Sequence, residues 1–237
     1  MRRHLILTGS CLLACWLLHS AAADDRARDV TAAVDHLVFI APDLDAGIAA
    51  VEALTGVRAA YGGSHPGLGT RNALLSLGPS SYLEIIAPDP TQPGFVGKRP
   101  FRIDDTPGAR LVTWAAKSDN VAALAALDLP GGANLGTAAA GSRRRPDGVS
   151  LSWRFTDPGT EVAGGVVPFF IDWGDTPHPA TSTPAGVTLK ALRFEHPDPT
   201  GVLAIFDALG ITASIETGPE PALVAELDTP KGRVLLR

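Results

Sequence analysis

His36 and Glu84 are the side chains whose type and setting most suggest chemistry. His36 lies in the alternating apolar segment 34–40 and Glu84 in the apolar segment 82–86, and both patterns are typical of strands with two buried faces. An unpaired carboxylate there is costly, so Glu84 should have a cation, a hydrogen-bond donor or a solvated cup beside it. His36 is either a ligand or a half-buried histidine that bonds a backbone carbonyl. The residues leave both interpretations open.

A second pair of candidates, His65 and Asn72, belongs to a glycine-rich segment and the strand after it. Residues 62–69 contain four glycines around His65, and such a loop lets backbone and imidazole approach a ligand closely. Asn72 is expected to share one face of its strand with Thr70 and Leu74. A binding site and a well-packed Ω-type loop fit this pattern equally well.

Other polar residues have a simpler structural explanation beside the functional one. Arg154 stands between two aromatic residues of a predicted strand; it either binds a carboxylate-bearing ligand or extends from the sheet edge into solvent. The arginine run 143–145 precedes a Pro-Asp-Gly turn and is predicted to be a solvated hairpin tip. His178 and His196 each precede a proline, which favours structural junctions after strands.

Several catalytic chemistries are absent from the sequence. It contains no GxSxG nucleophile elbow, no phosphate-binding glycine loop and no HExxH helix. Both cysteines, Cys11 and Cys15, lie in a segment that we expect to be removed. The mature chain therefore has no disulfide, no thiolate metal ligand and no cysteine nucleophile.

The first residues have the pattern of an export signal. Arg2 and Arg3 precede an apolar stretch from Leu5 to Leu18, and three alanines end at Ala23, a small-residue cleavage pattern. The apolar run is shorter than the roughly 20 residues of a spanning helix. We therefore predict a signal peptide over residues 1–23 and an exported protein, periplasmic or secreted, with no membrane attachment after cleavage.

The charge balance argues against one class of partner. The chain carries 20 basic and 25 acidic side chains, a formal net charge of −5, and loss of the leader removes two of the arginines. A negative surface repels phosphate backbones, so nucleic acid is not an expected partner.

The predicted elements recur along the chain. A strand, a helix and further strands appear first at 34–86, again at 111–173, where the helix is expected to reach Leu127, and begin a third time at residue 189. This order predicts an α+β fold of tandem βαβββ modules that form curled mixed sheets. The expected limits are a first module at 30–90, a second at 108–180, and a third, shorter module at 187–237 packed on the same domain.

Five segments together resemble the glyoxalase-like domain family of the vicinal oxygen chelate superfamily. They are Val34-Asp35-His36-Leu37-Val38, residues 63–75, residues 81–87, residues 168–173 and His178-Pro179. The resemblance implies the glyoxalase/bleomycin-resistance-like architecture, in which paired βαβββ modules curl their sheets around a cup. In the metal-using members, the cup holds a divalent ion.

The resemblance also implies a ligand set. In such a fold, a ligand from the first strand and a carboxylate from the last strand of each module converge, which makes His36 and Glu84 the expected pair in the first module. Laying Asn120 over Asp43 puts Thr113 where His36 stands, and the local pattern puts Asp172 where Glu84 stands. Imidazole and carboxylate suit Zn, Ni, Mn or Fe. Because a threonine hydroxyl is a poor ligand, the predicted site holds a weakly bound divalent metal or none.

Two functions follow from the resemblance. One is a metal-dependent lyase, isomerase or dioxygenase that acts on a small carbonyl or vicinal-oxygen compound, with Glu84 moving a proton and His65, Asn72 and Arg154 binding the substrate. The alternative is a non-catalytic exported binding protein with a degenerate metal site, which Thr113 favours. The expected partner is a small-molecule ligand in either case, and both a monomer and a homodimer remain open.

Overall fold

The computed structural model describes residues 30–237. The predicted signal peptide lies outside the described residues, so it remains a prediction. Within the described part, no helix is both long and apolar enough to cross a membrane.

The main body is one eight-stranded mixed sheet, with strand order β2-β3-β4-β1-β5-β8-β7-β6. The central pair β1 and β5 is antiparallel and joins two halves, in which β1 pairs with β4 and β5 pairs with β8 in parallel. The strands are β1 (Val34–Ile40), β2 (Ala60–His65), β3 (Thr70–Gly78), β4 (Ser81–Pro88), β5 (Arg110–Lys117), β6 (Ala139–Arg144), β7 (Ser150–Phe155) and β8 (Phe169–Asp172). The predicted α+β fold with curled mixed sheets is therefore confirmed.

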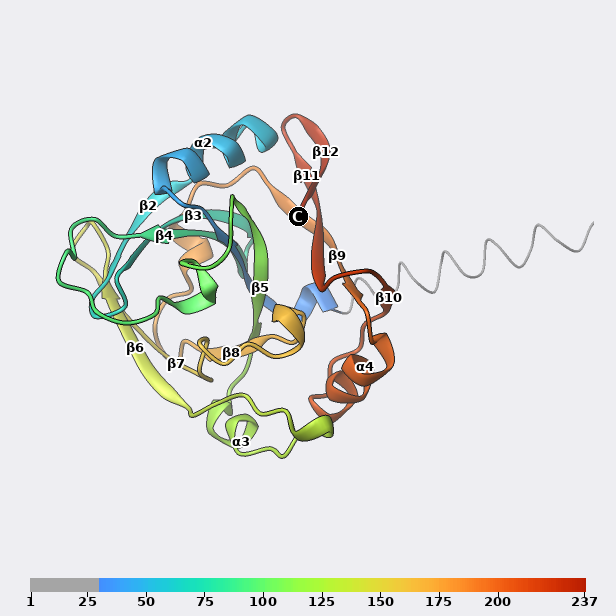
Figure 1. The fold of residues 1–237 in the computed structure, drawn as a ribbon. Coiled ribbons are helices and arrows are strands. Elements are labelled where there is room, and N and C mark those ends of the chain that lie inside the picture. Colours follow the sequence, from blue (N-terminus) through green and yellow to red (C-terminus); the bar gives the residue numbers. More distant parts are fainter. Residues whose placement is uncertain (1–29) are drawn as a thin grey trace, which may run out of the picture.

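The sheet curls until its edge strands β2 and β6 approach one another, as the view along the barrel shows (Figure 1). The guanidinium of Arg143 on β6 donates a hydrogen bond to the carbonyl of Gly62 on β2. A barrel closed in this way leaves no long unpaired edge, and its inner face surrounds a cup.

The helices at the start of the two halves have the same kind of cap. Asp43 Oδ1 accepts from Ala46 N at 2.9 Å at the start of α2 (Leu44–Thr55), and Asn120 Oδ1 accepts from Ala123 N at 3.3 Å at the start of α3 (Val121–Ala125). The sequence pattern predicts a longer second helix. Only Val121 of α3 is buried, so little tertiary packing supports a longer helix there.

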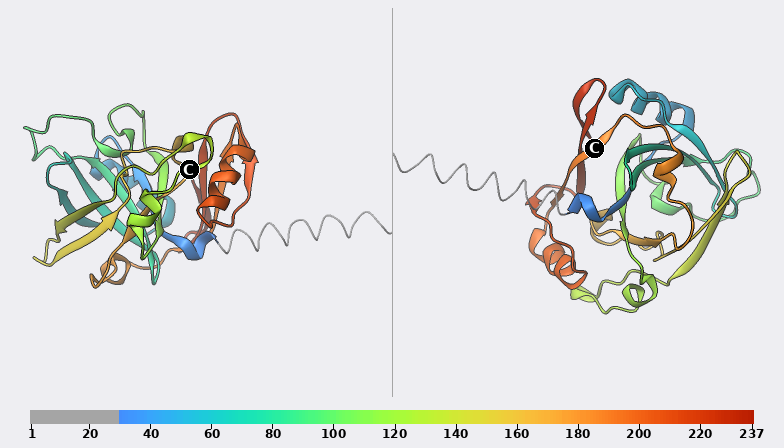
Figure 2. Two further views of the ribbon diagram at one scale, coloured as in Figure 1. Left: turned by 90° about the horizontal axis from the view of Figure 1, so that it is seen from below. Right: turned by 180° about the vertical axis from the view of Figure 1, so that it is seen from behind.

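The C-terminal segment forms a separate four-stranded sheet beside the barrel (Figure 2). It contains β9 (Thr188–His196), α4 (Pro199–Ala208), β10 (Ile215–Thr217), β11 (Ala222–Thr229) and β12 (Gly232–Leu236), in the order β10-β9-β11-β12. The first strand lies inside this sheet, whereas β1 lies at the end of the order in the first half. The strand–helix start recurs as predicted, but the strand pairing of the first module does not.

The two sheets share one apolar core. Trp114 of β5 packs against Phe194 of β9 at 5.6 Å between ring centroids, and Phe194 packs against Phe206 of α4 at 5.4 Å. Because side chains alternate along a strand, the opposite faces of β1 and β5 remain available to line the cup, where Val38, Ile40 and Ala115 form part of a second cluster.

Candidate functional site

An irregularity in β1 brings Asp35 and His36 together. Asp35 has no partner on β5, because the register shifts between Val34 and His36, and such a bulge redirects side chains that would otherwise face opposite sides of the sheet. His36 Nδ1 lies 2.8 Å from Asp35 Oδ1. Both side chains are buried, with exposed fractions of 3% for His36 and 1% for Asp35.

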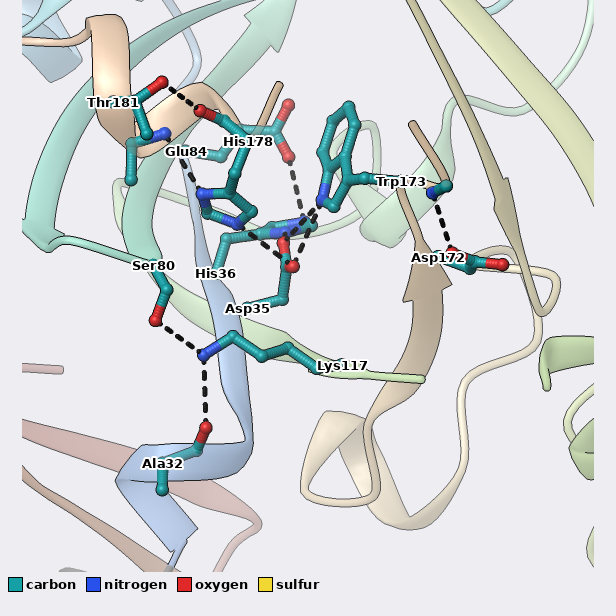
Figure 3. Close-up of polar contacts among 12 residues, drawn as sticks. Ala32, Asp35, His36, Ser80, Glu84, Lys117, Asp172, Trp173, His178 and Thr181 are labelled. Carbon is teal, nitrogen blue, oxygen red and sulfur yellow. Dashed lines mark hydrogen bonds and ion pairs between the residues drawn. The ribbon is translucent and has the colours of Figure 1, made fainter. Parts of the chain in front are cut away.

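The Asp35 carboxylate receives hydrogen bonds from three ring nitrogens (Figure 3). Besides His36, Trp173 Nε1 donates to Oδ2 at 3.1 Å, and His178 Nε2 lies 3.1 Å from the same oxygen. His178 Nδ1 accepts from Ala180 N at 3.2 Å, so its Nε2 carries the proton. Burial alone would raise the pKa of Asp35, but the bonds from His178 and His36 hold that pKa well below its ordinary value. Asp35 is therefore a buried negative charge.

This charge determines how His36 presents its ring. An ionised carboxylate only accepts hydrogen bonds, so Nδ1 of His36 carries a proton and Nε2 is the atom turned toward the cup. His36 Nε2 lies 3.7 Å from Glu84 Oε2. The ring stacks on Tyr82 at 4.6 Å between centroids and meets the edge of Phe169 at 5.4 Å. These contacts fix its position.

Glu84 is supported from the neighbouring strand. Asn72 Nδ2 on β3 donates to Glu84 Oε1 at 2.6 Å and lies 3.2 Å from His65 Nε2. His65 Nδ1 lies 2.9 Å from Thr70 Oγ1. Burial lowers the pKa of His65 in spite of the nearby charge of Glu84, so this imidazole is neutral and its Nε2 accepts from Asn72. Glu84 Oε2 is left facing His36.

These four residues line one pocket with aromatic walls. His36, His65, Asn72 and Glu84 border a cavity of about 70 Å³. It adjoins a wider hollow of about 680 Å³, which shares Phe101 and Phe169 with it. The aromatic wall residues are Tyr82, Phe101, Trp153, Phe155, Phe169 and Trp173. The arrangement places a few convergent polar groups at the end of an apolar pocket, as is usual for small-molecule sites.

Phe101, at the border of the two hollows, has an unusual backbone. Its φ is 61°, and that of the next residue, Arg102, is 52°. Non-glycine residues rarely adopt positive φ, because the β-carbon crowds the backbone. Strained residues of this kind cluster at ligand-binding segments, and the Phe101 ring lies 5.8 Å from Phe169.

The predicted site residues divide into two groups. His36, Glu84, His65 and Asn72 converge as described, whereas Asp172 and Arg154 do not join them. Asp172 and Arg154 pair with each other across β8 and β7 and border a different surface hollow. Asp172 Oδ1 accepts a hydrogen bond from Gly174 N at 2.8 Å, as aspartate often does in a turn at the end of a strand. Its side chain lies away from His36 and Glu84 (Figure 3).

The expected equivalence of Asp172 and Glu84 is wrong. Val38 pairs with Glu84, and Ala115 pairs with Phe169. Val38 and Ala115 stand at the same distance before the capping residues Asp43 and Asn120. Phe169 therefore occupies the place of Glu84 in the second half, and a local sequence pattern could not reveal this register.

Sequence reasoning missed two buried charges of this site. Asp35 is, like Glu84, a carboxylate in an apolar strand, so the cost of burying an unpaired carboxylate should have singled it out as well. Arg143 belongs to the predicted hairpin, but the expectation of a solvated arginine run is wrong for it. Its exposed fraction is 6%, and it lines the pocket while its neighbours Ser142 and Arg144 are exposed. The period-two alternation of a strand is the signal that marks Arg143 as inward-facing.

Comparisons with known proteins identify the fold and the family. The model of the glyoxalase-like domain matches residues 34–210, and the chain belongs to this family. A hypothetical protein from Staphylococcus aureus superposes with a TM-score of 0.56 at 12% identity, over 85% of this chain and 83% of that chain. No protein of the curated set matches the sequence.

Weaker structural similarity extends to methylmalonyl-CoA epimerases. The Mycobacterium tuberculosis enzyme has a TM-score of 0.38 at 18% identity, over 60% of this chain and 88% of that chain. A Streptomyces coelicolor epimerase in complex with 2-nitronate-propionyl-CoA gives 0.38 at 18% identity, over 61% and 96%.

The side chains present do not fit the divalent metal centre that the family implies. In this pocket, the atoms free to coordinate a metal ion are His36 Nε2 and Glu84 Oε2, which face each other. Thr113 and Phe169 occupy the equivalent places in the second half, and His65 Nε2 already accepts from Asn72. Between residues 30 and 237, no group of three His, Cys, Asp or Glu side chains is arranged to hold a metal ion. A catalytic zinc usually has three protein ligands, and these side chains supply only two.

Proposed function

We propose that this protein is a small-molecule enzyme that moves a proton at a carbon next to a carbonyl group, as an isomerase or lyase does. The observation that carries the proposal is the Asp35–His36–Glu84 arrangement, in which His36 Nε2 faces the cup 3.7 Å from a buried carboxylate. A general base needs a free lone pair within reach of the ligand and a partner that stabilises its charged form. His36 has both.

Asp35 has the role of a positioning residue in this proposal. When His36 Nε2 takes a proton, the ring becomes an imidazolium, and the adjacent negative carboxylate stabilises that charge. Trp173 and His178 hold Asp35 in place through their ring N–H groups. The carboxylate therefore fixes both the tautomer and the orientation of the base.

Glu84 is the second proton-handling group. Asn72 holds its Oε1, while Oε2 faces the same part of the cup as His36 Nε2. A proton that one group takes from an atom of a ligand can pass to the other group across this short distance and then be returned at a neighbouring atom of the ligand. The aromatic walls give these groups a less polar surrounding than bulk water, which strengthens electrostatic interactions in the pocket.

Solvent deuterium exchange tests this proposal. The chelator-treated protein, incubated in heavy water with phenylpyruvate, pyruvate, hydroxyacetone or propiophenone, should exchange the hydrogens next to the carbonyl of at least one of them, followed by proton NMR. His36→Ala and Glu84→Gln should slow this exchange by about 10²–10⁴-fold, the usual contribution of a general acid or base. His196→Ala, on β9 away from the cup, is the matched control and should exchange like the wild type.

Two results would count against the proposal. If no compound exchanges faster than in buffer although some of them bind, the cup belongs to the alternative class of non-catalytic binding protein. If exchange requires a divalent ion that His36→Ala loses, a metal-dependent mechanism replaces the one proposed. Circular dichroism and melting temperature verify that each variant is folded.

A further inference from the structure

Arg143 is a buried cation whose bonding capacity is largely unused. It lies on edge strand β6, opposite Leu151 of β7, with an exposed fraction of 6%. Its guanidinium donates one hydrogen bond, to the Gly62 carbonyl, and within residues 30–237 no carboxylate lies at ion-pair distance from it. A guanidinium has five N–H donors. Arginine is seldom buried without a paired anion.

The pocket is where the missing anion would sit. Arg143 lines the same cavity as His36, Glu84 and Asn72. Glu84 does not neutralise it by direct contact, since the carboxylate of Glu84 bonds to Asn72 instead. Burial lowers the pKa of Arg143, against the opposing charge of Glu84, but a guanidinium in a protein still keeps its proton. The cup therefore offers one permanent positive charge beside its proton-transfer groups.

The walls of the pocket indicate the rest of the ligand. Trp153 and Trp173 lie 5.3 Å apart between ring centroids, and Phe101 and Phe169 border the passage to the wider hollow. Flat aromatic surfaces favour offset-stacked or edge-to-face contact with another ring. A small anionic group in the inner cavity would thus place a flat apolar body along these walls.

We propose that Arg143 binds the carboxylate of the ligand, so that the substrate class is a carbonyl acid with a flat apolar body. The planar fork of arginine matches a carboxylate with two parallel hydrogen bonds. A carboxylate held there keeps the adjacent carbonyl carbon within the cup that His36 and Glu84 share. The catalytic part of this assignment rests on the proposed function, but the binding part can be measured separately.

A purely structural role for Arg143 is the competing explanation. Its bond to Gly62 joins β6 to β2 across the barrel seam, and a seam residue would affect stability without any preference for charged ligands. Charge selectivity in binding therefore separates the two roles.

Calorimetric titration with benzoylformate and with its neutral methyl ester makes this distinction. Benzoylformate has no hydrogen on the carbon next to its carbonyl, so binding is measured without exchange. Arg143→Met should weaken binding of the acid by about 10–100-fold, the loss expected for hydrogen bonds to a charged group, and leave the ester within twofold of wild type. The affinity of Arg143→Lys for the acid should lie between the affinities of the wild type and of Arg143→Met. Arg144→Met, at the exposed neighbouring position, should match the wild type.

Equal weakening for acid and ester, unchanged binding of the acid, or no binding of the acid by the wild type would overturn the proposal. Should Arg143→Met fail to fold, the wild type still decides the matter, because benzoate should raise its melting temperature more than benzamide does. Charge-selective binding without deuterium exchange in any probe would therefore refute the proposed function and leave the Arg143 site intact.

Discussion

At the scale of single residues, the site depends on how Asp35 is satisfied. A buried carboxylate without partners would be costly, yet Asp35 has ring N–H donors from His36, Trp173 and His178. These bonds bring two imidazoles and an indole from distant parts of the chain to one point. Asp35 thereby links the last segment of the second half, residues 173–178, to the first strand of the barrel.

We expect Asp35→Asn to destabilise the protein by about 1.5–3 kcal/mol at neutral pH, since each lost bond involves a charged acceptor. The pKa of Asp35 is lowered in the folded state from the ordinary value of 3.8. Its stabilisation is therefore complete above that value and is lost as the pH falls below it. Urea unfolding of both proteins should show a smaller difference in acid well below pH 3.8 than at neutral pH. A difference of undiminished size in strong acid would contradict this.

The residue scale also shows where sequence reasoning succeeds. The cost of burying a carboxylate was enough to single out Glu84, and a glycine-rich segment pointed to His65 and Asn72. Asp172 was misplaced because the register of β8 against β5 depends on tertiary pairing and leaves no local pattern. Arg143 was missed because its arginine neighbours give the segment the composition of a solvated turn.

At the scale of elements, the close packing of α2 on the barrel fixes the position of β1 and β4. A β-carbon added at Gly47 would lie 2.7 Å from Ala41 Cβ and 2.8 Å from Ile85 Cγ2. The helix can therefore lie against these strands only because residue 47 has no side chain. The aspartate cap and the apolar stripe predict the helix from the sequence, but they do not predict how closely the helix packs on the strands.

In Gly47→Ala, two effects on stability oppose each other: a higher helix propensity and a steric clash with the strands. Alanine favours a helix by about 1 kcal/mol over glycine, whereas overpacking a filled site costs about 1–3 kcal/mol. We expect a net loss of stability of up to about 2 kcal/mol, measured by urea unfolding. Ala50→Gly, at an exposed position of the same helix, serves as control and should lose about 1 kcal/mol from propensity alone. Stabilisation by Gly47→Ala would show that the helix does not lie this close.

At the scale of the whole molecule, the two sheets have different roles. The curled eight-stranded sheet uses its inner face for the cup, and the four-stranded sheet covers part of its outer face through Trp114, Phe194 and Phe206. Trp114 also donates from Nε1 to the Val166 carbonyl at 2.8 Å, which ties the central strand to the segment before β8. The recurrence of strand and helix starts was predictable from the sequence. The strand order of the C-terminal sheet was not, because strand pairing depends on long-range contacts.

The proposed function depends on one claim about the site. Asp35 holds a proton on His36 Nδ1 and thereby leaves Nε2 as the base in the cup. Nitrogen-15 NMR of histidine-labelled protein at mildly alkaline pH measures this directly, with the ring signals of His36 assigned through His36→Ala. The account predicts a protonated Nδ1 and an unprotonated Nε2 for this residue, and loss of that preference in Asp35→Asn. A proton on Nε2 in the wild type would contradict it, because the base would then have no lone pair facing the ligand.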